Sequence, residues 1–372
     1  MNLRRVSALI RKESSQIIRD PSSILIAFVL PLILLFIFGY GINLDSTKIN
    51  IGLALEGRGA DAGRLASAFI NSEFLNVRTA NDRRELLPEL EAGKIRGIVI
   101  IPQNFSIKAA LESESAVIQV IADGSEPNTA SFVHNYTAGI WQAWLLQHAE
   151  EEGAEMKMPI ASEPRFLFNP ELKSRNFLLP GSIAIIMTLI GTMLTSLVVA
   201  REWERGTMEA MMAKPVTVAE IILGKLVPYF VLGMGSMTVC VLVSVFFYGV
   251  PFRGSFLILS GVSALFLLAS LGQGLLISTL ARNQFVAAQL ALLSAFLPAF
   301  MLSGFIFEID SMPAVIRGLT YLFAARYFVT DLQTLFLAGN VKNLLIVNTA
   351  AIATIAAVFF AVTAAKTRKT LD

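Results

Sequence analysis

The stretch Arg201-Glu-Trp-Glu-Arg-Gly-Thr-Met-Glu-Ala-Met-Met-Ala-Lys-Pro215 is the only dense cluster of charge between two long apolar runs of this chain. The run that precedes it, from Asn176 to Ala200, has no ionisable side chain. It is longer than the roughly 20 helical residues that cross a bilayer. A helix formed by this run would leave the bilayer near Arg201. The sequence therefore predicts a membrane protein with a charged loop at the membrane surface.

The same stretch carries signals for a second, short helix. Gly206 predicts a break in the first helix, and Pro215 predicts where the second one stops. Glu209 would lie in the first turn of the second helix, where its charge suits the positive N-terminal end. Thr217-Val-Ala-Glu220 is a capping-box pattern and predicts the start of the next span. We therefore expect a short charged helix between two membrane helices, within residues 201–214.

The composition also indicates a polytopic membrane protein. Of the 372 residues, 55% are hydrophobic and only 16% are charged, which is too apolar for an ordinary soluble protein. The single cysteine, Cys240, lies inside an apolar run, so the sequence has neither a disulfide framework nor metal-ligand spacing. The charge distribution has no nucleic-acid signature. We therefore predict no metal site and no nucleic-acid partner.

The charged stretch resembles a known motif. Glu202-Trp-Glu-Arg-Gly-Thr-Met-Glu209 lies between two apolar spans and looks like the E-x-E-x-G-T-x-E loop of type-2 ATP-binding-cassette (ABC) exporter permeases. In that family this helix presses into a groove on a separately encoded ATPase subunit. The residues that the resemblance assigns to coupling are Arg201, Glu202, Glu204, Arg205, Gly206, Thr207 and Glu209. From the charge pattern alone, an ordinary cytosolic hairpin held near the headgroups by Trp203 and its Arg neighbours explains the stretch equally well.

The N-terminal residues predict an amphipathic helix followed by the first span. Between Leu3 and Arg19, apolar and basic side chains fall on different faces at helical spacing, which is typical of a helix on the membrane surface. A signal-peptide n-region is the alternative, but the next apolar run is too long and has no small-x-small cleavage site. We expect a cytosolic interface helix over residues 1–23 and a first transmembrane helix over 24–42, with a kink at Pro31. The residues that resemble the start of these permeases are Lys12, Glu13, Arg19, Asp20 and Pro21.

Residues 43–176 have the composition of a water-soluble domain. Strand-like and helix-like runs alternate here, which favours an α/β sheet with helices packed on it. We expect strands at Ile49–Leu55, Phe74–Thr79, Ile95–Ile101 and Ala116–Ala122, and helices at Asp61–Asn71, Asp82–Ala92, Phe105–Leu111 and Thr129–Gly153. A subgroup of the exporter permeases has a large external domain between spans one and two, so the resemblance implies that this domain lies outside the cytoplasm.

Four further apolar segments follow the charged stretch, at Leu223–Tyr248, Ser255–Leu280, Gln284–Phe307 and Leu344–Ala365. They contain no Asp, Glu, Lys, Arg or His except Lys225. Ion-coupled carriers keep such groups at membrane depth despite their cost, so we expect the driving force to come from outside the membrane region. The chain has no G-x-x-x-x-G-K-[ST] phosphate loop. We therefore expect no cofactor in this subunit, with ATP and Mg²⁺ bound by the partner ATPase.

Residues 308–340 are amphipathic and interrupted, and two short helices that dip part-way into the bilayer would fit them. Non-helical backbone at that depth must be buried in protein or line water, and a pair of surface helices is the alternative. The exporter permeases have a re-entrant helical hairpin here. The residues that resemble its pattern are Met312, Pro313, Arg326 and Tyr327, together with Gly339. The chain departs from the family at the outer gate, where Ala324 replaces a frequent Pro and Gln333 a frequent Arg.

The short loops predict the orientation, because Lys and Arg gather on the cytosolic side of a membrane. The residues placed inside are Arg4, Arg5, Arg11, Lys12, Arg19, Arg201, Arg205, Lys214, Arg282, Lys366, Arg368 and Lys369. Both termini are then cytoplasmic, and residues 43–176 lie outside, which in a Gram-negative cell is the periplasm. We therefore expect a multi-pass protein of the bacterial inner membrane.

These features together predict an α-helical polytopic membrane protein with six transmembrane helices, a re-entrant helical hairpin and an inserted external α/β domain. The resemblance implies the permease subunit of an ATP-driven exporter of an amphiphilic small molecule, drug or lipid-like. The partners it implies are an ABC ATPase, a second permease (the same chain or a paralogue) and membrane lipids, with a periplasmic adaptor as a further candidate. A membrane-anchored receptor or assembly scaffold is the alternative. An intramembrane enzyme is disfavoured, because the spans hold no paired carboxylates, His cluster or activated nucleophile.

Overall fold

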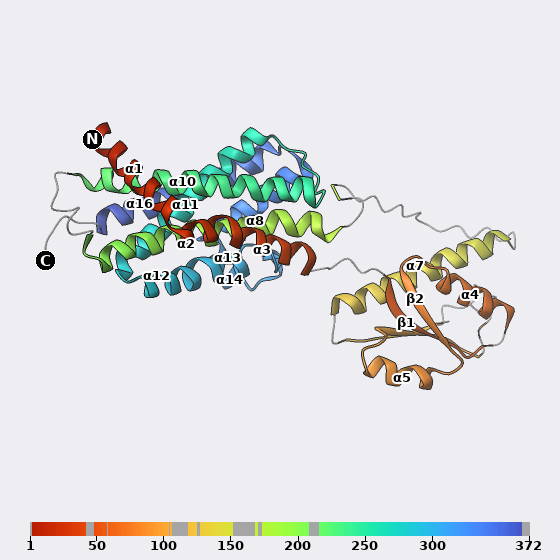
Figure 1. Cartoon of the computed structure of the whole chain (residues 1–372). Helices are drawn as coiled ribbons and strands as arrows, with labels where there is room; N and C mark the ends of the chain where they lie inside the picture. The colour runs from red at the N-terminus through yellow and green to blue at the C-terminus, as the bar shows by residue number, and fades with distance from the viewer. Residues whose placement is uncertain are drawn as a thin grey trace. The chain divides into compact units, whose positions relative to one another are not determined.

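The computed structural model describes residues 2–41, 48–57, 59–103, 105, 118–124, 127–151, 168–169, 173–207 and 216–366. The chain divides into two compact units, which Figure 1 shows as ribbons. The first consists of Met1–Leu44 and Arg165–Asp372, and the second of Asp45–Pro164. Each unit has a hydrophobic core of its own.

Within the described residues, the first unit has six helices that are long and apolar enough to cross a membrane. The first span is built from α2 (Pro21–Ile24), the π-helical turn η1 (Leu25–Val29), α3 (Leu30–Phe36) and the π turn η2 (Ile37–Gly41). The others are α8 (Ser174–Glu204), α10 (Val218–Leu242) with η3 (Val243–Phe247), α11 (Phe256–Ala281), the run of α12 (Gln284–Ala291), η4 (Leu292–Phe296) and α13 (Leu297–Leu302), and α16 (Lys342–Lys366). The six predicted spans are confirmed as helices, with ends shifted by a few residues.

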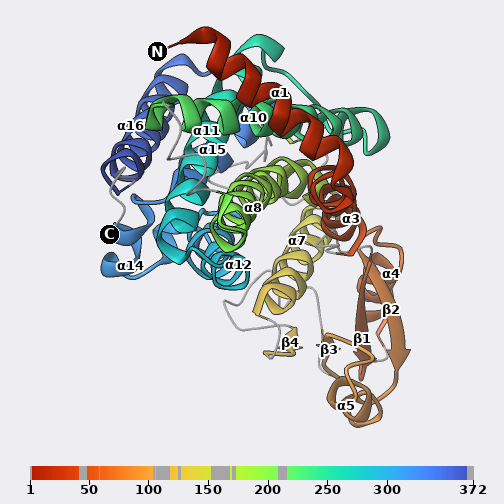
Figure 2. The same ribbon diagram turned by 60° about the vertical axis from the view of Figure 1, so that its left-hand side comes forward.

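The helix α8 is the central element of this bundle. Figure 2 shows it among α10, α11 and α12, and most of its side chains are buried. It approaches α11 very closely, because a Cβ added at Gly274 would lie 2.4 Å from the carbonyl oxygen of Thr192. Across the same contact, the Thr195 hydroxyl donates a hydrogen bond to the carbonyl oxygen of Leu271 at 3.0 Å. Small and hydroxyl residues of this kind let membrane helices pack backbone to backbone.

The segment between the fifth and sixth spans contains two short helices, as predicted. A 3₁₀ turn, η5 (Ile309–Ser311), precedes α14 (Ala314–Thr320), and α15 (Ala324–Gln333) continues into the π turn η6 (Thr334–Ala338). On α15, Phe328 is fully buried and stacks on Phe266 of α11 with ring centroids 4.0 Å apart. On α14, by contrast, the apolar side chain of Val315 is 78% exposed. The two short helices therefore have different surroundings, α15 inside the bundle and α14 on its surface.

The second unit is a four-stranded sheet with helices on both faces. The strand order is β2-β1-β3-β4, with β1 parallel to β2 and β3, and β4 antiparallel to β3. The strands are β1 (Ile49–Leu55), β2 (Leu75–Ala80), β3 (Gly97–Ile101) and β4 (Gln119–Ala122), and the helices are α4 (Ala60–Ile70), α5 (Arg83–Glu91) and α7 (Pro127–Glu151). The predicted α/β alternation is confirmed for these elements. The predicted helix 105–111 lies outside the described residues apart from Phe105.

The pleat of the sheet decides which helix covers which face. On β1, Ile51 and Leu53 lie in one buried cluster with Leu65 of α4 and Val133 of α7. On the opposite face, Ala54 belongs to a smaller cluster with side chains of α5 and β3. Successive strand residues point to opposite faces of a sheet, so both faces of β1 are buried, as expected for a parallel strand covered on both sides.

Candidate functional site

The amphipathic pattern between Leu3 and Arg19 forms the helix α1 (Leu3–Arg19), within the expected interface segment 1–23, and Asn2 caps it by accepting a hydrogen bond from the backbone N–H of Arg4. Its buried face contains Val6, Glu13 and Ile17. This face lies against α10 so closely that a Cβ at Gly224 would be 2.6 Å from the Cβ of Leu9. The helix is therefore anchored by protein contacts, and its buried face includes a carboxylate.

That carboxylate belongs to a buried charge cluster formed by Lys12, Glu13, Glu202 and Lys225, from α1, α8 and α10. The Lys12 ammonium donates to Glu202 Oε1 at 3.0 Å and lies 3.4 Å from Glu13 Oε1. The Lys225 ammonium pairs with the other Glu202 oxygen and lies 3.5 Å from Glu13 Oε1. Three of the four residues are less than 8% exposed, Glu13 at 1%, Lys225 at 4% and Glu202 at 7%. The two negative and two positive charges cancel, so three buried members and the partly exposed Lys12 form a neutral unit.

A second ion pair joins the end of α8 to the start of the first span. Arg201 Nη1 donates to Asp20 Oδ2 at 2.8 Å, while Asp20 caps α2 by accepting from the backbone N–H of Ser22 and from the Ser23 hydroxyl. Partial burial alone would raise the pKa of Asp20, but the hydrogen bonds from Ser22, Arg201 and Ser23 lower it to about 2. Asp20 is therefore a carboxylate throughout the physiological pH range.

The last turn of α8 also contacts the start of α12. Glu204 accepts from the backbone N–H of Gln284 at 2.9 Å and from its side-chain amide at 2.6 Å. The Arg282 guanidinium lies 4.8 Å from the centre of the Trp203 ring, which is within cation–π range. Together with the buried charge cluster, these contacts join the end of α8 to α1, α2, α10 and α12.

The start of α10 carries the predicted capping box, which is confirmed. The Thr217 hydroxyl accepts from the Glu220 backbone N–H, and the Glu220 carboxylate accepts from the Thr217 backbone N–H. Glu220 also accepts a hydrogen bond from the backbone N–H of Asn2 at 2.6 Å. These backbone hydrogen bonds, from Asn2 first, lower the pKa of Glu220. The residue therefore both caps α10 and holds the N-terminus of α1.

The predicted coupling residues fall into two groups, those that the structure describes and Glu209, which lies outside the described residues. Arg201, Glu202 and Glu204 lie in the last turn of α8, where all three are engaged with other parts of the chain. Gly206 has a φ of +64°, so the break predicted there is confirmed. Arg205 is the exposed C-cap, and the Thr207 hydroxyl donates to the carbonyl oxygen of Glu202 at 3.2 Å. Glu209 and the rest of the predicted short helix, residues 208–215, lie outside the described residues.

Sequence reasoning did not identify Lys225, Glu220 or Gln284 as members of this site. Lys225 offered a signal, because it is the one charge in an otherwise uncharged apolar segment, and such residues are normally kept only with a partner. Its partners could not be named, because they lie far away in the sequence. Two of the four cluster members are ammonium groups, which argues against a metal site there. Within the described part of the chain, no group of three His, Cys, Asp or Glu side chains could hold a metal ion.

In the segment of the two short helices, the structure gathers aromatic side chains around Arg326. Its guanidinium lies 3.7 Å from the centre of the Tyr321 ring and donates to the Thr320 hydroxyl. The Tyr327 hydroxyl donates to the carbonyl oxygen of Tyr321 at 3.1 Å. Met312 and Pro313 immediately precede α14, Pro313 as its N-cap. The described contacts thus place Arg326 and Tyr327 together at the turn between α14 and α15.

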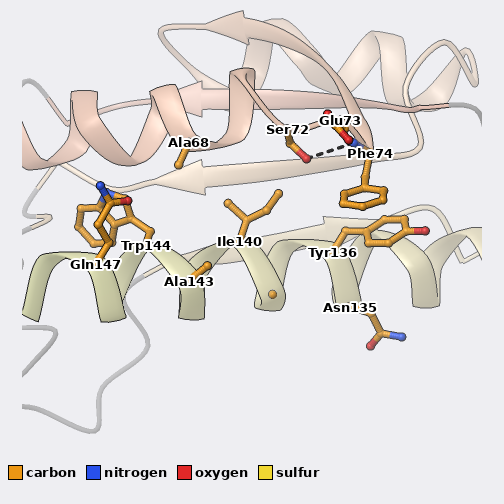
Figure 3. A pocket seen from close by; sticks show the side chains of 11 residues that line it. Ala68, Ser72, Glu73, Phe74, Asn135, Tyr136, Ile140, Ala143, Trp144 and Gln147 are labelled. Atoms are coloured by element: carbon orange, nitrogen blue, oxygen red, sulfur yellow. Dashed lines mark hydrogen bonds between the residues drawn. The ribbon is translucent and has the colours of Figure 1, made fainter. Parts of the chain in front are cut away.

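The second unit has a groove that the sequence did not predict. It encloses about 500 Å³ between α7 and the segment that joins α4 to β2. Figure 3 shows the Phe74 ring facing the Tyr136 ring at one end of the groove, and Trp144 at the other end. The Phe74 and Tyr136 rings are stacked, with their centroids 5.1 Å apart. The aromatic residues of α7 recur at helical spacing, and this was the one feature of the sequence that could have indicated the groove. The wall opposite α7, however, is set by tertiary packing.

Comparison with known proteins gives consistent relatives over most of the chain. A family model described as ABC-2 family transporter protein matches residues 21–365. The probable multidrug ABC transporter permease YbhS of Escherichia coli K12 is 55% identical over 372 residues, covering 100% of this chain and 99% of the relative. The probable multidrug ABC transporter permease YbhR of the same organism is 30% identical, covering 90% of each chain. The inner membrane transport permease YhhJ is 27% identical over 83% of this chain.

Proposed function

The chain belongs to the ABC-2 transporter family as a multi-pass membrane permease, and we propose that it exports an amphiphilic small molecule, drug or lipid-like, with ATP hydrolysed on a separate subunit. Membership of the family implies an ATPase partner. The two relatives named above as multidrug permeases support a hydrophobic or amphiphilic cargo. In this proposal, ATP and Mg²⁺ are bound by the partner ATPase, and this subunit supplies the pathway.

The observation that carries this proposal is the buried charge cluster at the end of α8. Glu202 lies at the start of the segment 201–214, which resembles the ATPase-contacting helix of the family. Because Glu202 is paired with Lys12 and Lys225, a displacement of that segment would move α1 and α10 together with α8. A movement of the ATPase that displaces this one loop would thus move three helices together. The mechanism requires no ion site at membrane depth.

The proposal includes an orientation, a second subunit and roles for two further parts. Residues 43–176 would lie in the periplasm as an external domain, with both termini in the cytoplasm of a bacterial inner-membrane protein. The helices α14 and α15 would form the re-entrant hairpin, supported by the exposed apolar side chains of Val315, Ile316 and Leu319 on α14. Two permeases, as a homodimer or with a paralogue, would form the conduit, since six helices rarely enclose one. A periplasmic adaptor would meet the external domain.

The coupling part of the proposal is tested by Glu209→Ala in vesicles that contain this permease and its ATPase. A carboxylate in a partly shielded basic groove contributes about 1 to 3 kcal/mol through charge-assisted hydrogen bonds. We expect the variant to insert and dimerise normally but to lose both export of a fluorescent amphiphile and substrate-stimulated ATP hydrolysis. The matched control is Glu91→Ala, which removes an exposed carboxylate from α5 and should export normally. Normal export by Glu209→Ala with the ATPase still bound would favour the receptor or scaffold alternative.

The orientation is tested by single cysteines and an impermeant thiol reagent. The native Cys240 is fully buried, so it gives little background labelling. Cysteine at Ser255 should react from outside intact cells, whereas cysteine at Thr370 should react only after the cells are opened. Labelling of the Thr370 position in intact cells would contradict cytoplasmic termini.

A further inference from the structure

A basic cavity of about 460 Å³ lies at the end of α8 that is opposite the buried charge cluster. It is formed by residues just before and within the first turn of α8 and by the connection between α10 and α11. One candidate span begins at Ser174 and another ends at Phe247. The cavity is therefore at the level where these spans leave the membrane. Its volume is in the range of small-molecule sites.

Among the residues that the structure describes, the charged side chains that line the cavity are all basic. They are Lys173, Arg175 and Arg253. In the part of the chain that the structure describes, neither Arg175 nor Arg253 has an ion pair within 4.0 Å. Like charges repel, so Arg175 and Arg253 at one cavity cost free energy unless an anion joins them. A guanidinium without a carboxylate partner is the side chain best suited to bind a phosphate through two parallel hydrogen bonds.

The backbone that carries Arg253 is held in place. Its N–H donates to the carbonyl oxygen of Phe336 at 3.2 Å, and Gly339, at a φ of +94°, packs against its carbonyl group. Two residues further on, the N–H of Ser255 donates to the side chain of Asn340 at 2.9 Å. The connection between α10 and α11 is thus fixed on the segment before α16, so Arg253 extends from a supported loop.

The polar floor of the cavity is also ordered. The Asn176 amide donates to the Asn169 side-chain oxygen, and the Asn169 amide donates to the carbonyl oxygen of Lys173, both at 2.9 Å. Tyr248 is 5% exposed, and its hydroxyl has no hydrogen-bond partner among the described residues. Burial and the neighbouring Tyr40 raise the pKa of Tyr248, although Arg175 opposes them. The hydroxyl therefore remains a protonated donor, and a buried donor without an acceptor is a destabilising feature that a bound anion would relieve.

We propose that this cavity binds a phosphate group at the membrane surface, as carried by a phospholipid headgroup. Arg175 and Arg253 would hold the phosphate oxygens, and Tyr248 would donate one further hydrogen bond. The location supports a lipid, because headgroup phosphates lie where spans leave the hydrocarbon. In the alternative, the two arginines only extend into water, but this does not explain why the buried Tyr248 hydroxyl has no hydrogen-bond partner among the described residues. The proposal does not depend on the direction of transport.

The test uses the purified full chain, delipidated in dodecyl maltoside and without ATP or ATPase. Lipid binding is followed by native mass spectrometry and by thermal unfolding, with the probes phosphatidylglycerol, diacylglycerol and inorganic phosphate. We expect phosphatidylglycerol to bind saturably and to raise the unfolding temperature, and diacylglycerol to do neither. Removing a charge-assisted hydrogen bond should weaken binding about tenfold or more, so Arg175→Gln with Arg253→Gln should abolish the shift. Tyr248→Phe should weaken it less.

The matched control is Arg317→Gln, which removes an exposed guanidinium from α14 and should leave lipid binding unchanged. Each variant without lipid should unfold at the temperature of the wild-type chain, which shows that the fold is intact. If inorganic phosphate displaces phosphatidylglycerol from the wild type, the phosphate group alone is recognised. If it does not, while binding still requires both arginines, the lipid itself is the ligand. Equal binding of phosphatidylglycerol by the wild type and the double variant, or equal protection by diacylglycerol, would overturn the proposal.

Discussion

Removing one member of the buried charge cluster should destabilise the permease far more than removing an exposed charge. In Glu202→Gln, the Lys225 ammonium loses its nearest carboxylate and retains only Glu13, at 3.5 Å. The cluster then carries one uncompensated positive charge, and Lys225 is only 4% exposed. Breaking a buried ion pair in this way costs about 3–5 kcal/mol. Lys225→Met should cost a similar amount, because it leaves two carboxylates with only Lys12.

The structure supplies two matched comparisons for this prediction. The Lys12 side chain is 43% exposed, so solvent can reach its place in the cluster and screen the remaining carboxylates, and Lys12→Met should cost less than Glu202→Gln or Lys225→Met. The double variant Glu202→Gln with Lys225→Met removes one charge of each sign and leaves Lys12 with Glu13. Since neutral replacement of a buried pair is often tolerated, it should be more stable than either single variant, within about 1 kcal/mol of the wild type.

The buried thiol of Cys240 gives a direct readout of unfolding. In dodecyl maltoside micelles titrated with sodium dodecyl sulfate, a thiol-reactive fluorophore should label Cys240 only when the bundle opens. The midpoint and slope of that transition give the free energy of unfolding of each variant. The prediction is contradicted if Glu202→Gln and Lys225→Met unfold with the same free energy as Lys12→Met, or if the double variant loses the sum of the two single losses.

Three further outcomes follow from the geometry. Gly274→Ala should lower the free energy of unfolding by about 1–3 kcal/mol, because the new methyl group would meet the α8 backbone. Gly261→Ala in the same helix has open space around the new group and should not, so equal losses in the thiol-labelling assay would refute the close contact. Arg326→Lys should lower the free energy of unfolding by about 1 kcal/mol, because Lys cannot stack flat on the Tyr321 ring. Amide hydrogen exchange in α14 and α15 should become faster. Unchanged exchange rates would contradict a stabilising role for this contact. The folded-state pKa of Asp20 is lowered, so its contribution to the free energy of unfolding should be fully present above pH 4 and should disappear as the pH falls toward 2. Asp20→Asn should abolish that part of the pH dependence of unfolding. An unchanged pH dependence would show that other carboxylates cause it.

The features that could be predicted from the sequence are those decided by local pattern. Runs of apolar residues long enough to cross a bilayer predicted all six spans, and the alternation of strand-like and helix-like runs predicted the sheet and its helices. The cap formed by Thr217 and Glu220 was also visible, because both partners are three residues apart. The π turns were not predicted. At Pro31, the kink expected from the proline coincides with η1, a widened turn that ends two residues earlier, and such turns are a recognised cause of helix bending.

The parts of the site that could not be predicted depend on residues far apart in the sequence. Nothing near Lys12 shows that its partner is Glu202, 190 residues away, and nothing near Asn2 points to Glu220. Such pairs are set by how α1 lies on α10, which the amphipathic pattern does not encode. The same limit applies to the basic cavity, because Arg175 and Arg253 come together only through the packing of α8 beside the α10–α11 connection.

The large sequence separation between the members of the buried charge cluster also sets the order in which the cluster can assemble during synthesis. Glu13 and Lys225 are 212 residues apart, and at about 5–20 residues per second the ribosome needs roughly 10–40 s to travel between them. For most of that interval α1 has been made, but Glu202 has not, and Lys225 is added only at its end. The N-terminal helix must therefore wait with its charges in water or at the headgroups. It can enter its final position only after the third span begins to emerge, so its docking reports that half of the bundle has been inserted in the correct register.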